Sequence, residues 1–181
     1  MIRQLLGIAP LLVCSSLAFA ADDAAVRQAI DGFYRVHQQS SQDGVPDSKQ
    51  RAKYAPYISP DLAKLLTEAD AAEGRFAKAN KDSPPLVEGD LFSPNFEGIS
   101  AFKVNTCTAA GSIAHCKVKL HFADRSPRPQ EKPVDWVDTV TMVKTPAGWR
   151  VDDIAYGGNW DFGKHGTLKA ILKKVIAESG G

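Results

Sequence analysis

The spacing of apolar residues changes along this chain, and the order of that change constrains the fold more than any other feature. Before Pro84-Pro85 the apolar positions recur every three or four residues, which is typical of amphipathic helices. From residue 99 onward they alternate with polar residues or are β-branched and aromatic, which is typical of strands. We therefore predict an α+β domain in which N-terminal helices pack on a curved antiparallel sheet of about four strands, followed by a C-terminal helix.

Turn and capping residues mark the ends of the expected elements. The first helix is expected over residues 22–40 and is followed by a polar loop to residue 49. Its packed face is expected to consist of Val26, Ile30, Phe33, Tyr34 and His37. A second helix is expected to begin near Ser59, where a serine suits the N-cap and Pro60 suits the first turn. The remaining elements are expected at residues 99–107, 113–123, 134–145 and 148–156 for the strands and 167–178 for the last helix.

The N-terminus has the three parts of a secretory signal peptide. Arg3 provides a short basic region, Leu5 to Phe19 is apolar, and Ala18-Phe19-Ala20 is a small-x-small cleavage site. We therefore expect residues 1–20 to be a signal peptide cleaved after Ala20 and residues 21–181 to form a single cone-like α+β domain. The protein would then be periplasmic or secreted, with no membrane span in the mature chain.

Cys14 raises a second interpretation of the N-terminus. A lipoprotein signal places a cysteine directly after a small residue, and lipidation there would anchor the protein to a membrane. Val13 stands before Cys14 instead of glycine, alanine or serine. We therefore favour ordinary cleavage over a lipid anchor at Cys14.

Charge excludes one class of partner. The formal net charge of the full chain is +1, and residues 1–20 contain Arg3 and no acidic residue, so the remaining chain is formally neutral. A neutral domain without a run of lysines or arginines has no general attraction to nucleic acid or to an anionic membrane. We expect no nucleic-acid partner.

Two cysteines, Cys107 and Cys116, remain after removal of the signal peptide, and they flank a turn at Gly111-Ser112. In an oxidising compartment such a pair is expected to form a disulfide, and the alternatives are a metal pair or a reactive thiol. In an unbulged hairpin the two cysteines would face each other, but apolar residues on one strand would face polar residues on the other. We therefore expect a β-bulge, the alternative being a sheet covered on both faces.

One stretch carries a family resemblance. Gly148-Trp149-Arg150-Val151-Asp152-Asp153-Ile154 precedes Tyr156 and a final apolar helix, and Trp136 opens the preceding strand. The chain resembles an uncharacterised family of exported bacterial proteins and lipoproteins, domain of unknown function 3828, over about residues 25 to 176. The resemblance implies a cone like that of nuclear transport factor 2, with helices inside a bent antiparallel sheet. The missing lipobox departs from the lipidated relatives.

Asp138 is the candidate catalytic residue. It is expected in mid-strand on the same face as Trp136, Val140 and Met142. A carboxylate among apolar neighbours has a raised pKa and can act as a base. Carboxylates on strands are more often exposed or paired with a cation, and we expect that arrangement here. Histidines at metal-ligand spacing and phosphate-binding loops are absent from the sequence, so we expect no metal and no cofactor.

Aromatic residues gather late in the chain and are the candidate binding residues. Trp136 and Tyr156 are expected at strand ends, and Trp160 and Phe162 in the glycine-rich segment that follows. If Trp160 and Phe162 are exposed they would anchor an interface, and if they are packed they would plug the open end of the cone.

Three functions follow from these observations, in order of preference. The first is a non-catalytic binding or adaptor domain for an envelope protein or a small apolar ligand. The second is an immunity-type inhibitor of a secreted toxin. The third is a pocket enzyme of isomerase type that would use Asp138 as its base.

Overall fold

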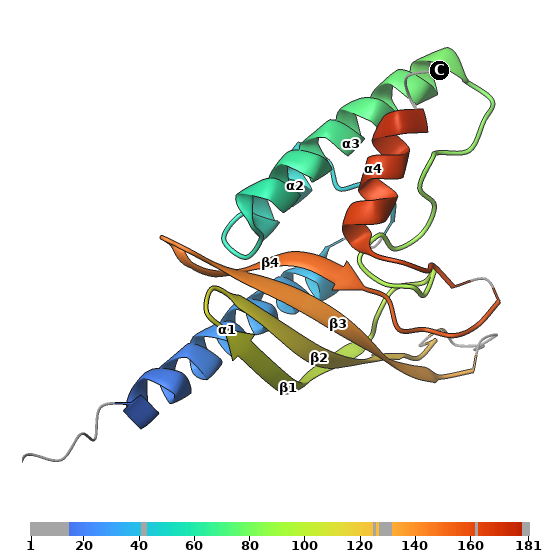
Figure 1. Ribbon diagram of the computed structural model, residues 1–181. Helices are drawn as coiled ribbons and strands as arrows, with labels where there is room; N and C mark the ends of the chain where they lie inside the picture. Colours follow the sequence, from blue (N-terminus) through green and yellow to red (C-terminus); the bar gives the residue numbers. More distant parts are fainter. Residues whose placement is uncertain (1–14, 41–42, 125, 127–131, 162, 179–181) are drawn as a thin grey trace, which may run out of the picture.

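The computed structural model describes residues 15–40, 43–124, 126, 132–161 and 163–178. Within these ranges the chain forms four helices and one four-stranded antiparallel sheet (Figure 1). The elements are α1 (Ser15–Gln39), α2 (Ser48–Tyr54), α3 (Pro60–Ala79), β1 (Ala101–Ala110), β2 (Ile113–Phe122), β3 (Val134–Thr145), β4 (Gly148–Ala155) and α4 (Leu168–Glu178). The predicted α+β class, with helices first, four curved antiparallel strands and a last helix, is confirmed.

Helix α1 lies inside the curve of the sheet. Its backbone comes close to both edge strands, β1 and β4, and much less so to β2 and β3, because the sheet bends around the helix. The helical stripe that the sequence predicts is fully buried, and it consists of Val26, Ile30, Phe33, Tyr34 and His37. Helices α3 and α4 pack on each other beside β4 (Figure 1).

The N-terminal predictions concern residues at the border of the described ranges. Residues 1–14, which include Cys14, lie outside these ranges. Helix α1 begins at Ser15, ahead of the expected cleavage point after Ala20. Signal-peptide cleavage therefore stays a prediction. Among the helices in the described ranges, none combines the length and the apolar character that crossing a membrane requires.

The helix starts show how local sequence sets the boundaries. Ser59 caps α3 as predicted, because its hydroxyl accepts a hydrogen bond of 3.0 Å from the backbone N–H of Leu62. Helix α2 was not predicted. It begins within a polar stretch at a reciprocal capping box, in which Asp47 accepts from the N–H of Gln50 and the Gln50 side chain accepts from the N–H of Asp47.

The sheet has the order β1-β2-β3-β4, and its first hairpin contains the expected bulge. Asn105 is the extra residue, so that Val104 faces Val118 and Phe102 faces Leu120. Apolar residues therefore meet on one face, as the bulge was expected to ensure. Cys107 faces Cys116 beyond the bulge and forms a disulfide with it.

The outer edge of β4 is covered by the chain itself. The N–H of Val151 donates to the carbonyl of Tyr57 at 2.8 Å, and the N–H of Ser59 donates to the carbonyl of Val151, also at 2.8 Å. The segment before α3 thus pairs with β4 like a short extra strand, at the bridge between Ile58 and Val151. This edge offers few free main-chain groups to a partner.

Candidate functional site

The structure brings the predicted site residues together at one end of the cone. Trp136 and Asp138 lie on the inner face of β3, and Tyr156 and Trp160 lie in the segment after β4. The rings of Trp136 and Trp160 meet edge to face, with centroids 5.5 Å apart. Phe162 lies outside the described residues. Trp160 is half-buried and packs against the core, which is nearer to the packed alternative than to the exposed one.

Asp138 is fully buried, so the expectation that its carboxylate is exposed or paired with a cation is wrong. Its Oδ1 atom accepts a hydrogen bond of 2.8 Å from the N–H of Gly157. Any side chain at position 157 would collide with the carbonyl oxygen of Val137, which a Cβ would approach to 1.9 Å. Glycine therefore permits the close approach that gives Asp138 its one hydrogen bond.

The other oxygen of Asp138, Oδ2, has no hydrogen-bond partner among the described residues. Burial raises the pKa of Asp138 to about 7, although the Gly157 N–H and the nearby indole N–H of Trp136 act in the opposite direction. The indole influences the carboxyl by proximity, but within the described structure its Nε1 atom makes no hydrogen bond. Asp138 is thus a buried carboxyl in which one of the two oxygens has no hydrogen-bond partner among the described residues.

Tyr34 adds a third unused polar atom to the same region. Its hydroxyl is buried and unpartnered in the described part of the chain. Burial raises the pKa of Tyr34 well above its ordinary value, and the charge of Asp138 raises it further, which places the phenol near the carboxyl. The hydroxyl of Tyr34, the indole N–H of Trp136 and Oδ2 of Asp138 thus come from α1 and β3 and share the interior of the cone.

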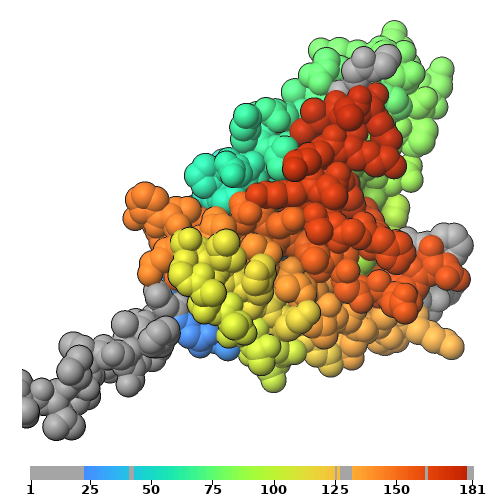
Figure 2. All heavy atoms as spheres, in the orientation of Figure 1, coloured from blue at the N-terminus to red at the C-terminus, as the bar shows by residue number. Residues whose placement is uncertain are grey.

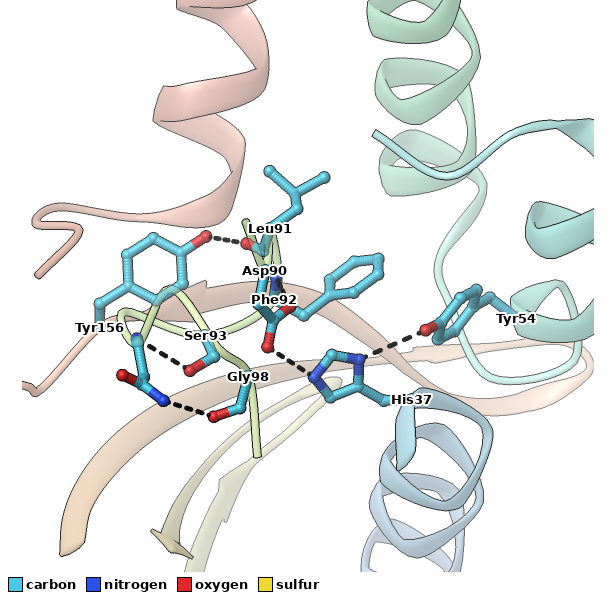
Figure 3. Close-up of polar contacts among 9 residues, drawn as sticks. His37, Tyr54, Asp90, Leu91, Phe92, Ser93, Gly98 and Tyr156 are labelled. Atoms are coloured by element: carbon cyan, nitrogen blue, oxygen red, sulfur yellow. Dashed lines mark hydrogen bonds and ion pairs between the residues drawn. The ribbon is translucent and has the colours of Figure 1, made fainter. Parts of the chain in front are cut away.

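A second polar group in the interior is fully paired (Figure 3). His37 Nε2 lies 2.9 Å from Oδ2 of Asp90, and both side chains are buried. The other Asp90 oxygen accepts from the N–H of Phe92 at 2.8 Å, and the hydroxyl of Tyr54 lies 3.4 Å from His37 Nδ1. The group joins α1, α2 and the loop before β1.

The helical spacing of the sequence places His37 in the core but does not identify its partner. Asp90 lies in a loop without periodicity, 53 residues from His37, and no motif connects the two. A buried histidine at helical spacing was the one available signal, because such a ring needs a partner.

Tyr156 holds that same loop over the interior (Figure 3). Its hydroxyl donates to the carbonyl of Leu91 at 2.5 Å. Within the loop, the side-chain amide of Asn95 donates to the carbonyl of Gly98 at 2.9 Å. Burial raises the pKa of Tyr156 well above its ordinary value, and the charges of Asp90 and Asp138 raise it further. Tyr156 therefore lies near both carboxyl groups but uses its hydroxyl to fix the backbone.

The described residues contain no group of three histidine, cysteine, aspartate or glutamate side chains that could hold a metal ion. His115 and His121 lie on the outer face of the sheet, near Thr141 at 3.2 Å and Asp135 at 3.0 Å respectively. The chemistry of the site therefore rests on one carboxyl, a phenol and an indole.

Comparisons with known proteins were made with the whole chain. No family model matches it, and no curated protein matches it. Among solved structures, the phospholipid-binding protein from Ralstonia solanacearum, solved in complex with a phospholipid, aligns with 88% of this chain and 89% of its own at 16% identity and a TM-score of 0.34. A TM-score this low carries no argument about fold or ligand, and the phospholipid belongs to that protein alone.

Proposed function

We propose that this chain is a non-catalytic binding domain that holds a small, mostly apolar ligand in the interior of its curved sheet. The observation that carries the proposal is a set of three buried polar atoms, on Tyr34, Trp136 and Asp138, that have no hydrogen-bond partner among the described residues. A buried polar group without a partner costs about 1–3 kcal/mol. A ligand that supplies the missing hydrogen bonds recovers part of this free energy on binding.

The identity of the three atoms indicates the chemistry of the ligand. The indole of Trp136 only donates a hydrogen bond, and the phenol of Tyr34 donates and accepts. Asp138 accepts when ionised and donates when protonated, and with its pKa near 7 both forms are populated at neutral pH. The surrounding side chains, such as Val140 and Met142, are apolar and buried. The set suits an apolar body that carries one hydroxyl, carbonyl or carboxyl group.

We also propose that the protein works outside the cytoplasm. The support is the signal-peptide pattern of residues 1–20 together with the disulfide between Cys107 and Cys116, a bond that forms and persists in oxidising compartments. The N-terminus of the protein isolated from its host shows where cleavage occurs, and we expect it at Ala21.

The proposal is tested by native mass spectrometry of the protein isolated gently from the envelope fraction of its own host. Wild-type protein should carry a bound small molecule. Asp138→Asn should lose it, because the amide cannot offer the same donor and acceptor pattern at Oδ2. The matched control is Asp135→Asn, which changes an exposed carboxylate on the opposite face of the same strand. Equal retention in both variants, or no small molecule in any sample, contradicts the proposal.

A second candidate is a pocket enzyme of isomerase type, and one observation favours it. A base works best when its pKa lies near the working pH, and the pKa of Asp138 is raised to about 7 by burial. If Asp138 removes a proton from carbon, the co-purified molecule should take up deuterium in heavy water with wild-type protein and not with Asp138→Asn. If the molecule takes up no deuterium with the wild-type protein, the isomerase candidate is wrong and the binding function remains.

A further inference from the structure

The two edges of the sheet differ, and the edge at β1 is only partly protected. Along its first half, the side-chain amide of Gln38 donates to the carbonyl of Ser100 at 2.9 Å. The guanidinium of Arg27 donates to the carbonyl of Asn105 at 3.2 Å, at the bulge. Such side-chain caps and bulges are the usual means of preventing a foreign strand from pairing with an edge.

The second half of β1, from Thr106 to Ala110, has none of these protections within the described structure. It contains no charged residue and no proline, and apart from half-buried Cys107 its residues are exposed. The hairpin lies at the surface of the molecule, in yellow and yellow-green in Figure 2. A neutral, exposed edge of small and β-branched residues is a template for pairing with another strand.

The register of the hairpin identifies the main-chain groups that face outward. Ala110 pairs with Ile113 across the two-residue turn, so these two residues form a hydrogen-bonded pair. Hydrogen-bonded and non-bonded pairs alternate along antiparallel strands, which makes Cys107 and Ala109 non-bonded positions. The Cα atoms of Cys107 and Cys116 are 4.1 Å apart, the close spacing of a non-bonded pair. The N–H and C=O groups of Cys107 and Ala109 therefore point away from β2.

A cleft runs beside these outward-facing groups. Its volume is about 530 Å³, and it lies between Cys107 and Ala109 on the strand and Asp23, Val26 and Arg27 on α1. At Arg27 it meets a second cleft of about 600 Å³ that follows the first half of the strand. The two clefts together form a groove between a helix and a strand edge, which is the arrangement in which peptides bind by strand addition.

The charge of the groove selects among extended segments. Arg27, Arg35 and Lys103 are the basic residues that line the groove, and Asp23 and Asp31 are its acidic residues. Arg27 is paired with Asp23 at 2.9 Å, so the excess positive charge lies on Arg35 and Lys103, beside the second cleft. Arg35 is largely exposed and reaches Asp31 only at 3.5 Å, so its charge remains available to a partner. The groove thus favours a segment with acidic side chains beside small apolar ones.

We propose that the outer edge of β1 binds an extended, acidic segment of a partner polypeptide by strand addition, with main-chain hydrogen bonds to Cys107 and Ala109. The Tyr57–Ser59 segment already binds the β4 edge in this way, through Val151. The disulfide supports the site because it holds Cys107 against β2 while the main-chain groups of that residue point away from β2. The strand edge is separate from the interior that holds Asp138, so this proposal does not depend on the ligand-binding function.

The test uses the full mature chain and the fluorescent peptide acetyl-Glu-Val-Thr-Val-Thr-Glu-amide. Binding is followed by fluorescence anisotropy, and the amides of β1 are followed by hydrogen exchange. We expect slower exchange at Cys107 and Ala109 when the peptide binds. Replacing both glutamates with lysines should weaken binding by about tenfold or more, because the charges of the groove then repel the peptide.

Backbone substitutions separate strand addition from binding by side chains. Ala109→Pro removes an N–H that points away from β2, so the ladder stays intact while binding weakens by about tenfold. N-methylated peptides provide the same test without altering the protein. One series is methylated at the odd-numbered residues and the other at the even-numbered residues. Only one of these series should bind, because only every second N–H group of the peptide faces β1.

The proposal is wrong if the hydrogen exchange of the Cys107 and Ala109 amides is unchanged up to about 1 mM peptide. It is also wrong if the two N-methylated series bind equally well. A third contradicting result is a dimer in analytical sedimentation in which the β1 amides are protected from exchange without peptide. The last result would show that the occupant is a second copy of this chain.

Discussion

Asp90 and Asp138 are both fully buried carboxylates, yet their surroundings differ. Both oxygens of Asp90 have partners, His37 at 2.9 Å and the N–H of Phe92 at 2.8 Å. Asp138 has one partner, the N–H of Gly157, and its Oδ2 atom has none in the described structure. Burial alone therefore does not distinguish a structural carboxylate from a functional one, whereas the hydrogen-bond partners do.

The difference also separates the two neighbourhoods. The Asp90 group connects three segments of the chain through hydrogen bonds that use both carboxyl oxygens of Asp90 and both ring nitrogens of His37. Near Asp138, the hydroxyl of Tyr34, the indole N–H of Trp136 and Oδ2 of Asp138 itself have no hydrogen-bond partner among the described residues. We assign stability to the first neighbourhood and binding to the second, and the following substitutions test that division.

The largest effect is expected at Asp90. Asp90→Ala removes one member of a buried pair and leaves His37 and the N–H of Phe92 without a partner, so the free energy of unfolding should fall by about 3–5 kcal/mol. Urea denaturation measures it. Asp31→Ala, which removes a half-exposed carboxylate paired to Arg35, is the control and should cost at most about 1 kcal/mol. Similar losses in the two variants would contradict a structural role for Asp90.

The second effect concerns the pH dependence caused by Asp138. Its pKa in the folded protein is about 7, above the unfolded value of 3.8, so between these pH values the folded state binds more protons than the unfolded state. The free energy of unfolding should therefore fall as pH rises from about 4 to about 7, by up to about 4 kcal/mol, and then level off. Asp138→Asn should remove this slope, and urea titrations at several pH values measure it. A slope that persists in the variant would assign it to other groups.

The smallest effect compares two buried tyrosines. Tyr54→Phe removes a hydroxyl that contacts His37, and should lower the free energy of unfolding by about 1 kcal/mol. Tyr34→Phe removes a hydroxyl without a partner in the described structure and should be neutral or slightly stabilising. Thermal denaturation of the two variants side by side gives the difference. The reverse order would mean that the Tyr34 hydroxyl is already satisfied.

Much of the fold was predictable because its signals are local. The stripe from Val26 to His37, the Ser59 cap and the two-residue turn at Gly111-Ser112 each depend on residues close together in sequence. The bulge was predictable because the disulfide register and the apolar pattern of the hairpin disagreed without it. Helix α2 was missed because it is short and polar, and the capping box of Asp47 and Gln50 was the one sequence pattern that indicates its start.

The candidate site was predictable in part. Trp136, Tyr156, Trp160 and Phe162 were the candidate binding residues, and Asp138 was the candidate base that we expected to be exposed or paired. The structure brings Trp136, Tyr156 and Trp160 close to Asp138, whose burial was not expected, and their role stays a prediction. Sequence patterns assign residues to a face of a strand and do not show what covers that face. Tyr34 and Gly157 reach Asp138 from segments more than a hundred residues apart in sequence, and that proximity depends on how the whole chain folds.

The central claim is that Asp138 is a buried carboxyl with a free oxygen and a raised pKa. A carbon-13 NMR titration of the aspartate carboxyl carbons tests it most directly, with Asp138→Asn to assign the resonance. We expect the Asp138 carboxyl to titrate with a pKa of about 7. A carboxyl at position 138 that titrates near the ordinary value of 3.8 would show that the group is solvated or paired, and would contradict the account.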